Sequence, residues 1–418
     1  MHVSEELIRN PISRENRDLS PAENAGSETE GKMSKDWKTK LIHSEAEIPQ
    51  GFRSLATPVY RGSTVLFDKA AEADEHWNHY DHGYTYGLYG TPTTLELAAK
   101  VCELEHGYRT FITPGGQGAI SLVHLALMRA GDHVLIPENI YGPNRKFAND
   151  VLRRFGVEVS YYAPAAGAEI EKDLRPNTRV VWCENPGSLT MEVQDVPAMV
   201  EASHRHGALV VLDNTWSSGV YFDAFTHGVD VSLQALTKYV GGHSDVLLGS
   251  VTVRDAKLFD LIGETYQVLG CAASPDDCSL ALRGMKTLAV RLKQVEHSAL
   301  ALARWLATRP EIERVLHPAL PSCPGHELWK RDFTGSSGLF SFVFRESFSK
   351  ERVLKFVDAL DLFEIGYSWG GVNSLVMTYD LQSPKRPAYG SRLVRLYVGL
   401  EDVEDLKRDL EKALGGVQ

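Results

Sequence analysis

Short apolar runs alternate with longer amphipathic stretches through the middle of the chain, from about residue 107 to residue 253. The apolar runs favour β-strands, and they lie at residues 134–136, 157–159, 180–182 and 209–212. Helical periodicity separates them, for example over residues 118–128 and 196–206. Buried strands that alternate with helices are typical of a mostly parallel sheet covered on both faces. We therefore predict an α/β fold whose ligands bind at the carboxyl ends of the strands.

A second, smaller α/β domain is expected after this region. A long helical pattern covers about residues 276–308, and Pro310 marks its end. Beyond it the pattern predicts a strand, a helix, a strand and a last helix, at residues 338–344, 350–360, 393–398 and from 401 onward. Placing the hinge within the long helical region gives a large domain over residues 93–290 and a C-terminal domain over residues 291–418.

Composition narrows the class of protein. The chain has 418 residues and a net charge of −11, which argues against a nucleic-acid binder because phosphate contacts need a basic face. Its five cysteines are odd in number and form no CxxC pair, so we expect reduced thiols in a cytoplasmic protein and neither disulfides nor a metal site. No apolar run is long enough to span a bilayer. Residues 1–34 are expected to form a disordered acidic tail.

An aspartate and a lysine follow two of the apolar runs. Asp213 directly follows the run at residues 209–212, and Lys238 follows a run that starts at Val231. Taken singly, most aspartates at strand ends are turn or cap residues, and the lysine could lie on the surface. Burying an ammonium group costs free energy, however, so a lysine after a buried run needs an explanation. Together the two residues place an acid and an amine at neighbouring strand ends.

Pyridoxal phosphate (PLP) chemistry uses such a pair. A carboxylate beside the pyridine nitrogen keeps it protonated, so that the ring accepts carbanion charge. A lysine forms an imine with the cofactor and later moves a proton. Desolvation lowers the amine pKa toward neutrality, which aids both tasks. The sequence therefore predicts a PLP enzyme that holds its cofactor on Lys238, with Asp213 at the ring nitrogen.

The segment at residues 113–118 is a candidate phosphate site. It follows an apolar stretch, is rich in glycine and opens a helix, so the backbone N–H groups of Gly116 and Gln117 can approach an anion. Most glycine-rich turns are only turns, and this one gains weight by preceding the aspartate and the lysine. Tyr141 also lies just after a strand. Its ring can stack on a pyridine there, although an ordinary loop tyrosine would show the same pattern.

Two later features suit an amino-acid substrate. Arg395 lies in the apolar strand pattern at residues 393–398, where a guanidinium needs an anionic partner. A substrate carboxylate and an internal salt bridge both satisfy this need. The Tyr-Ser-Trp-Gly-Gly sequence at residues 367–371 is a tight segment of small residues that could line a pocket.

From about Lys40 to its end, the chain resembles the trans-sulfuration (Cys/Met metabolism) enzymes of PLP fold type I, the aspartate-aminotransferase-like fold. The segments that carry the resemblance lie at residues 84–87, 131–135, 187–193, 213–216, 237–239, 242–245, 326–338 and 367–371. The Ser-Trp-Gly-Gly sequence in the last of these is most similar to the bacterial cystathionine β-lyases, because γ-synthases and γ-lyases usually have Ser-Leu-Gly there. The family fold agrees with the α/β pattern described above.

The resemblance implies a role for each candidate residue. Lys238 would hold the cofactor and carry the proton, Asp213 would pair with the pyridine nitrogen, and Tyr141 would stack on the ring and help deprotonate the incoming amine. The residues implied as phosphate ligands within the chain are Gly116, Gln117 and Thr237. Tyr86 of a neighbouring subunit is implied as a further phosphate ligand that also takes part in catalysis.

The same resemblance implies how the substrate binds and how subunits assemble. Arg395, with Ser368 and the backbone of Trp369, would bind the α-carboxylate of a small amino-acid substrate. Residues 35–92 would form an arm that contributes to the neighbouring subunit, in a homotetramer built from dimers. The implied reaction is α,β-elimination on L-cystathionine, which yields homocysteine, pyruvate and ammonia.

Two positions depart from the family pattern at the cofactor phosphate. Leu88 stands where an arginine is usual, and Ala235 stands where a serine is frequent. A hydrogen bond to a charged group contributes about 1.5–3 kcal/mol, so these changes bear on cofactor affinity and on the substrate. Two alternatives stay open: γ-elimination, γ-replacement or a β/γ-lyase reaction on another amino acid in specialised metabolism, and a non-catalytic binding protein on the same fold.

Overall fold

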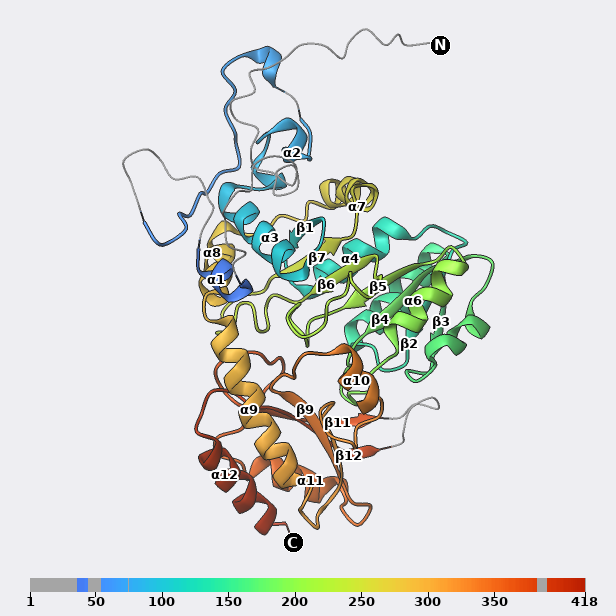
Figure 1. Cartoon of the computed structure of the whole chain (residues 1–418), viewed down its shortest axis with the longest axis vertical. Helices are drawn as coiled ribbons and strands as arrows, with labels where there is room; N and C mark the ends of the chain where they lie inside the picture. The colour runs from blue at the N-terminus through green and yellow to red at the C-terminus, as the bar shows by residue number, and fades with distance from the viewer. Residues whose placement is uncertain (1–35, 44–53, 74, 382–388, 418) are drawn as a thin grey trace.

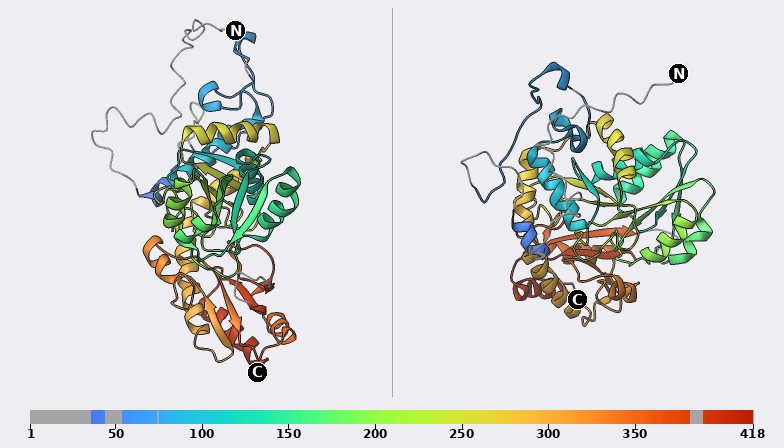
Figure 2. Two further views of the ribbon diagram at one scale, coloured as in Figure 1. Left: turned by 90° about the vertical axis from the view of Figure 1, so that its right-hand side faces the viewer. Right: turned by 45° about the horizontal axis from the view of Figure 1, so that its top comes forward.

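The computed structural model describes residues 36–43, 54–73, 75–381 and 389–417, and these form two α/β units stacked along the molecule's long axis (Figure 1). Seen from the side, the smaller unit lies below the larger one (Figure 2). Helix α9 (Leu288–Leu306) runs from the larger unit into the smaller one. The tail expected at residues 1–34 lies outside the described residues.

A seven-stranded sheet forms the centre of the larger unit, in the order β1-β7-β6-β5-β4-β2-β3. Its strands are β1 (Arg109–Thr113), β2 (His133–Pro137), β3 (Glu158–Tyr162), β4 (Thr178–Glu184), β5 (Leu209–Asp213), β6 (Val231–Gln234) and β7 (Gly249–Val253). From β6 to β3 the strands are parallel, whereas β7 pairs antiparallel with both β6 and β1. The predicted mostly parallel sheet is confirmed, and the four predicted strands are β2 to β5.

Helices cover both faces of this sheet, because each strand buries side chains on both sides. In β4, Val181 and Cys183 point into one apolar core, and Val180 and Trp182 point into the other. This double burial explains why the strands have continuous apolar sequences. The helices before α9 are α1 (Trp37–Ile42), α2 (His79–His82), α3 (Pro92–Glu105), α4 (Gly116–Leu127), α5 (Gly142–Phe147), α6 (Val196–Arg205), α7 (Ala256–Leu269) and α8 (Pro275–Met285).

A five-stranded sheet forms the smaller unit, in the order β10-β11-β12-β9-β8. It is antiparallel except for the short pair β10 and β11. A third apolar core packs against it and includes Phe340, Phe342 and Phe344. The elements are β8 (Ile312–Leu316), α10 (His326–Asp332), β9 (Leu339–Phe344), α11 (Lys350–Asp358), β10 (Glu364–Ile365), β11 (Leu375–Leu381), β12 (Gly390–Tyr397) and α12 (Val403–Gly415).

The single long helical region expected at residues 276–308 is wrong in one respect, because it consists of α8 and α9 with a break between them. Gly284 packs on the carbonyl of Gly241, where an added Cβ would lie 2.2 Å from the oxygen. The Gly284 carbonyl accepts a hydrogen bond of 2.7 Å from Arg291. The chain therefore bends at Gly284, where it packs against the segment that follows Lys238. The domain limits at residues 290 and 291 remain a prediction.

Trp77 attaches the N-terminal segment to the larger unit. Its ring is buried and packs on α7 at Gly263 and beside Phe259, whose ring centroid is 5.3 Å away. A side chain at position 263 has no room, because an added Cβ would lie 2.0 Å from the Trp77 ring. The glycine therefore determines how closely this segment approaches the helix.

We expect Gly263→Ala to destabilise the protein by about 1–3 kcal/mol, because its methyl group overpacks the Trp77 contact. Urea unfolding followed by tryptophan fluorescence measures the change. Gly415→Ala is the matched control, since Gly415 ends α12 with open space around its Cα. That variant should be neutral or more stable by up to about 1 kcal/mol. An equal loss of stability in both variants would contradict the packing argument.

Candidate active site

Two ionisable groups meet at the carboxyl edge of the parallel sheet. Asp213 ends β5, and Lys238 lies in the turn after the neighbouring strand β6. Burial raises the pKa of Asp213, while hydrogen bonds from Thr215 and the charge of Lys238 oppose the rise. Burial lowers the pKa of Lys238 to about 8, Arg395 lowers it as well, and Asp213 raises it. The predicted acid and amine therefore act on each other in one site, together with the predicted arginine.

Thr215 connects Asp213 to the segment that carries Lys238. Its hydroxyl donates to Asp213 Oδ1 at 2.5 Å, and its backbone N–H donates to the same oxygen at 3.1 Å. The same hydroxyl accepts a hydrogen bond of 2.9 Å from the N–H of Ala235. Sequence reasoning missed this residue, although an aspartate that accepts from the residue two positions on is a recognised turn signal.

A buried carboxyl group at the end of helix α3 supports the same strand ends. Glu105, the last residue of α3, accepts hydrogen bonds from Ser232 at 2.9 Å and Asn214 at 3.2 Å, and another from Gln234. Burial raises the pKa of Glu105 to about 7, and these hydrogen bonds oppose the rise. Glu105 thereby joins α3 to β6 and to the residue after Asp213.

The predicted Ser-Trp-Gly-Gly segment packs directly on Lys238. The Lys238 amine donates to the Ser368 hydroxyl at 2.6 Å and lies 5.6 Å from the centroid of the Trp369 ring. An added Cβ at Gly370 would lie 2.7 Å from the Lys238 carbonyl carbon, so only glycine permits this approach. Ser368 itself has φ of +77°, a strained conformation that the surrounding contacts must maintain.

Arg395 faces the same space from β12 of the smaller unit. Its Nη2 donates to the Ser368 carbonyl at 3.4 Å, and its guanidinium carbon lies 5.1 Å from the centroid of the Tyr379 ring. Burial lowers its pKa, and the tyrosines 379, 141 and 367 oppose this effect. Among the described residues no carboxylate pairs with Arg395, so the alternative of an internal salt bridge finds no support there.

The N-terminus of α4 lies against the segment before Lys238. An added Cβ at Gly116 would lie 2.7 Å from the Ala235 methyl group, and no side chain caps this helix end. The Gln117 Oε1 atom is buried without a hydrogen-bond partner among the described residues. The Thr237 hydroxyl accepts from the Leu248 N–H at 3.0 Å and donates to its carbonyl at 3.1 Å. Thr237 would have to release that carbonyl before it could donate to a phosphate.

Tyr141 borders the site from the loop between β2 and α5. Its backbone N–H donates to Glu184 Oε2 at 2.6 Å, and its side chain is 42% exposed. Burial raises the pKa of its hydroxyl, as do Asp213 and Glu184, whereas Arg395 lowers it. Glu184 ends β4 in register with Asp213 and is a further residue that sequence reasoning missed.

Tyr86 is not brought to this cluster within one chain. It pairs with Thr64 through an isolated β-bridge, its ring packs edge-on against Tyr89, and 43% of its surface is exposed. Leu88, two residues further on, is half-buried. A role for Tyr86 at the cofactor therefore remains a prediction that requires a second subunit.

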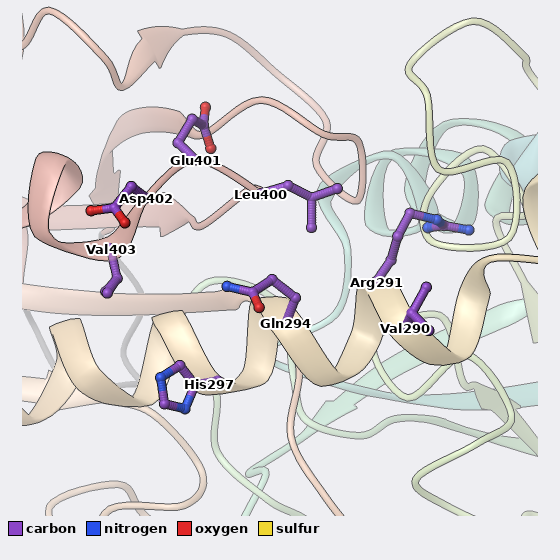
Figure 3. Close-up of a pocket in the computed structure, with 8 residues that line it drawn as sticks. All are labelled: Val290, Arg291, Gln294, His297, Leu400, Glu401, Asp402 and Val403. Carbon is purple, nitrogen blue, oxygen red and sulfur yellow. The ribbon is translucent and has the colours of Figure 1, made fainter.

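A surface hollow of about 660 Å³ lies elsewhere, between α9 and the loop before α12 (Figure 3). Three of its polar side chains already stabilise the fold. Arg291 donates to the Tyr239 carbonyl at 2.7 Å, Glu401 accepts from the Ser374 N–H at 2.7 Å, and Asp402 caps α12. This hollow contains none of the predicted site residues, so we assign the active site to the sheet edge.

Neither a metal-binding cluster nor a membrane-spanning helix is found in the part of the chain that the structure describes. No cluster of three or more potential metal-ligating side chains occurs there. No helix there is both long and apolar enough to cross a membrane.

The pKa of Lys238 gives its amine a distinctive pH dependence. Without bound ligand, the rate at which Lys238 reacts with an acylating reagent should reach half its plateau near pH 8, because the neutral amine is the reactive form. Arg395→Leu removes a positive charge and should move this midpoint to higher pH, whereas Asp213→Asn should move it lower. Peptide mass spectrometry of the acylated lysine measures the rate. Unchanged midpoints in both variants would disprove the coupling.

The contact between Gly370 and Lys238 is tested by Gly370→Ala. The new methyl group meets the Lys238 backbone, and Gly370 has φ of +92°, so we expect at least a tenfold loss of PLP affinity. Absorbance titration of the cofactor-free protein measures the affinity. Gly366→Ala is the control, because its Cβ would make only a 3.4 Å contact with Leu375. Equal affinities in the two variants would show that the contact is unimportant.

Comparisons with known proteins identify the family of the chain. Residues 38–415 match the family of Cys/Met metabolism PLP-dependent enzymes. Cystathionine beta-lyase MetC of Escherichia coli is 41% identical over 383 residues, 89% of this chain and 96% of the relative. An L-alanine/L-glutamate racemase of Wolbachia pipientis is 37% identical, over 86% of this chain and 92% of its own.

A solved structure extends the agreement to the fold. Cystathionine gamma synthase of Xanthomonas oryzae superposes with a TM-score of 0.85 at 30% identity, covering 92% of this chain and 98% of that chain. The sequence resemblance, the sheet order and the lysine–aspartate pair thus lead to one conclusion. The chain belongs to the Cys/Met metabolism PLP-dependent enzymes.

Proposed function

We propose that this protein is a carbon–sulfur lyase that cleaves L-cystathionine by α,β-elimination, giving homocysteine, pyruvate and ammonia. The observation that carries the proposal is the meeting of Lys238, Ser368 and Arg395, with Asp213 beside the amine. The shared family and the 41% identity to a cystathionine beta-lyase support it. Family membership makes PLP the cofactor.

The residues present suit PLP at both of its ends. Asp213 provides a carboxylate surrounded by protein for the ring nitrogen, and Lys238 provides an amine with a pKa of about 8 for the carbonyl carbon. At the other end, the uncapped N-terminus of α4 at Gly116 and Gln117 offers backbone donors to the phosphate. The unpartnered side-chain oxygen of Gln117 is an acceptor and adds no donor for the phosphate, so the backbone N–H groups carry this fit.

When bound, PLP supplies a carbonyl group that condenses with amines and a ring that accepts the electrons of a carbanion. Lys238 then removes the proton from Cα of the substrate, because its lowered pKa leaves much of the amine neutral near pH 8. The Ser368 hydroxyl, which accepts the hydrogen bond from this amine, keeps it directed into the site. Breaking the Cβ–S bond would then release homocysteine, with the proton taken up by Lys238 passing to its sulfur, and water would hydrolyse the remaining three-carbon enamine to pyruvate and ammonia.

Arg395 orients the substrate for this proton transfer. A guanidinium binds a carboxylate through two parallel N–H bonds, so it fixes both position and rotation. Because Ser368 contacts both Arg395 and Lys238, the bound α-carboxylate lies close to the amine that removes the Cα proton. Tyr141 is in electrostatic reach of both Asp213 and Arg395, where its ring can stack on the cofactor. Burial raises the pKa of its hydroxyl, so Tyr141 would take a proton from the incoming amine, as the family resemblance implies, only if the bound cofactor lowered that pKa.

A second subunit completes the site in this proposal. Tyr86 makes no described contact with Lys238 in its own chain, and 43% of its surface is exposed, which leaves the residue accessible to a neighbouring subunit. Leu88 and Ala235 leave fewer donors there, so the phosphate depends more on α4 and on the neighbour. We therefore infer a homodimer as the minimum active unit, and a tetramer as the full assembly. The five free cysteines accord with a cytoplasmic location.

Product analysis tests the reaction. Holoenzyme incubated with L-cystathionine should release pyruvate and homocysteine, whereas 2-oxobutyrate would indicate γ-elimination. D-alanine formed from L-alanine without any pyruvate would indicate a racemase like the Wolbachia relative. Lys238→Ala should lower pyruvate formation by at least about a hundredfold, since it removes the base. Lys355→Ala, an exposed lysine on α11, is the control and should keep full activity. Equal activity of both variants would refute the role of Lys238.

A further inference from the structure

Tyr379 stacks on the arginine that we assign to the substrate carboxylate. It lies on β11, which pairs antiparallel with β12, and Met377 is the residue directly opposite Arg395. Tyr379 is two residues along from Met377, so its side chain is on the same face of the sheet as the guanidinium. The guanidinium carbon lies 5.1 Å from the centroid of the tyrosine ring. We propose that Tyr379 is a positioning residue that holds Arg395 ready for an α-carboxylate.

The physical argument begins with the isolation of this cation. Burial is the largest effect that lowers the pKa of Arg395, so protein has replaced much of its water. Its hydrogen bond to the Ser368 carbonyl is long, at 3.4 Å, and leaves most of its N–H groups available. A partly buried guanidinium that has no carboxylate partner among the described residues needs another source of stabilisation. The ring of Tyr379 supplies it through the attraction between a cation and an aromatic face.

An aromatic partner differs from an acidic one in its effect on binding. A carboxylate at this position would neutralise Arg395 and occupy the N–H groups that a substrate needs. The ring attracts the cation by its face, consumes no N–H group and leaves the positive charge in place. Tyr379 thereby limits the rotation of the guanidinium without competing with the substrate.

The surroundings of Tyr379 keep its ring fixed and neutral. The side chain is half-buried and packs against the large apolar core of both units. Burial is the largest cause that raises its pKa, so the phenol stays protonated near neutral pH. Tyr367 and Tyr141 also border Arg395 but differ in setting, since Tyr367 is 76% exposed and Tyr141 belongs to the larger unit. Of the three, Tyr379 has the position to orient the arginine.

The inference rests on the proposed function only in assigning Arg395 to an α-carboxylate. Two small amines test it on the holoenzyme: glycine, which has a carboxylate, and methylamine, which has none. Their dissociation constants follow from the absorbance change of the bound cofactor. Tyr379→Leu should weaken glycine binding roughly five- to thirtyfold and leave methylamine binding unchanged. Tyr379→Phe keeps the ring and should restore glycine binding to within about twofold.

A matched control separates this effect from the loss of any stacked tyrosine. Tyr161 on β3 makes the same kind of contact outside the candidate active site, because the guanidinium carbon of Arg145 lies over its ring, 4.1 Å from the centroid. Tyr161→Leu should leave both dissociation constants unchanged. Thermal unfolding of all variants shows whether each has folded. With L-cystathionine, Tyr379→Leu should raise KM by a similar factor and keep kcat within about twofold.

Three outcomes would overturn the inference. They are unchanged glycine binding in Tyr379→Leu, equal weakening of glycine and methylamine, and failure of Tyr379→Phe to restore glycine binding. The amine titrations do not require cleavage of L-cystathionine. If the holoenzyme releases no pyruvate yet glycine alone is weakened in Tyr379→Leu, the proposed reaction fails and the role of Tyr379 stands.

Discussion

The arrangement of the candidate active site depends on keeping the amine of Lys238 inside the protein. An ammonium group surrounded by protein is costly, and the chain meets that cost by letting the pKa of Lys238 fall to about 8. The arrangement around Lys238 follows from this constraint. Asp213 attracts the charged form, Arg395 repels it, and Ser368 accepts a hydrogen bond from it. Removing any of the three would change how readily the amine gives up its proton.

The backbone is arranged to make these contacts short. A side chain at Gly370 would occupy the space of the Lys238 carbonyl carbon. A side chain at Gly116 would likewise collide with the methyl group of Ala235. Thr215 joins Asp213 to the Ala235 N–H, so the acid and the amine cannot move independently. Glu105 supports the strand ends from the buried side. The site is therefore a set of close backbone contacts with a few charged groups at its centre.

Much of the fold could be predicted from the sequence because the parallel strands are buried on both faces. The run at residues 180–182 is apolar throughout since Val180 and Val181 serve opposite cores. Lys238, Asp213 and Arg395 were predictable for a different reason: charged residues in apolar patterns are unusual enough to suggest chemistry. The break between α8 and α9 was not predictable, because its cause is a contact between Gly284 and the distant Gly241 carbonyl.

The same limit applies to Glu184 and Tyr379, which lie near the site only after folding. Thr215 differs, because its place two residues after Asp213 is visible in the sequence. Of the groups discussed, the larger unit supplies Lys238 and Asp213, whereas the smaller one supplies Ser368 and Arg395. In the proposed function, the cofactor-binding groups and the groups that bind the α-carboxylate are thus encoded in separate stretches of the gene. Under the proposed function, mutations in β11 and β12 change how firmly the α-carboxylate is held, while Lys238 and Asp213 stay unchanged.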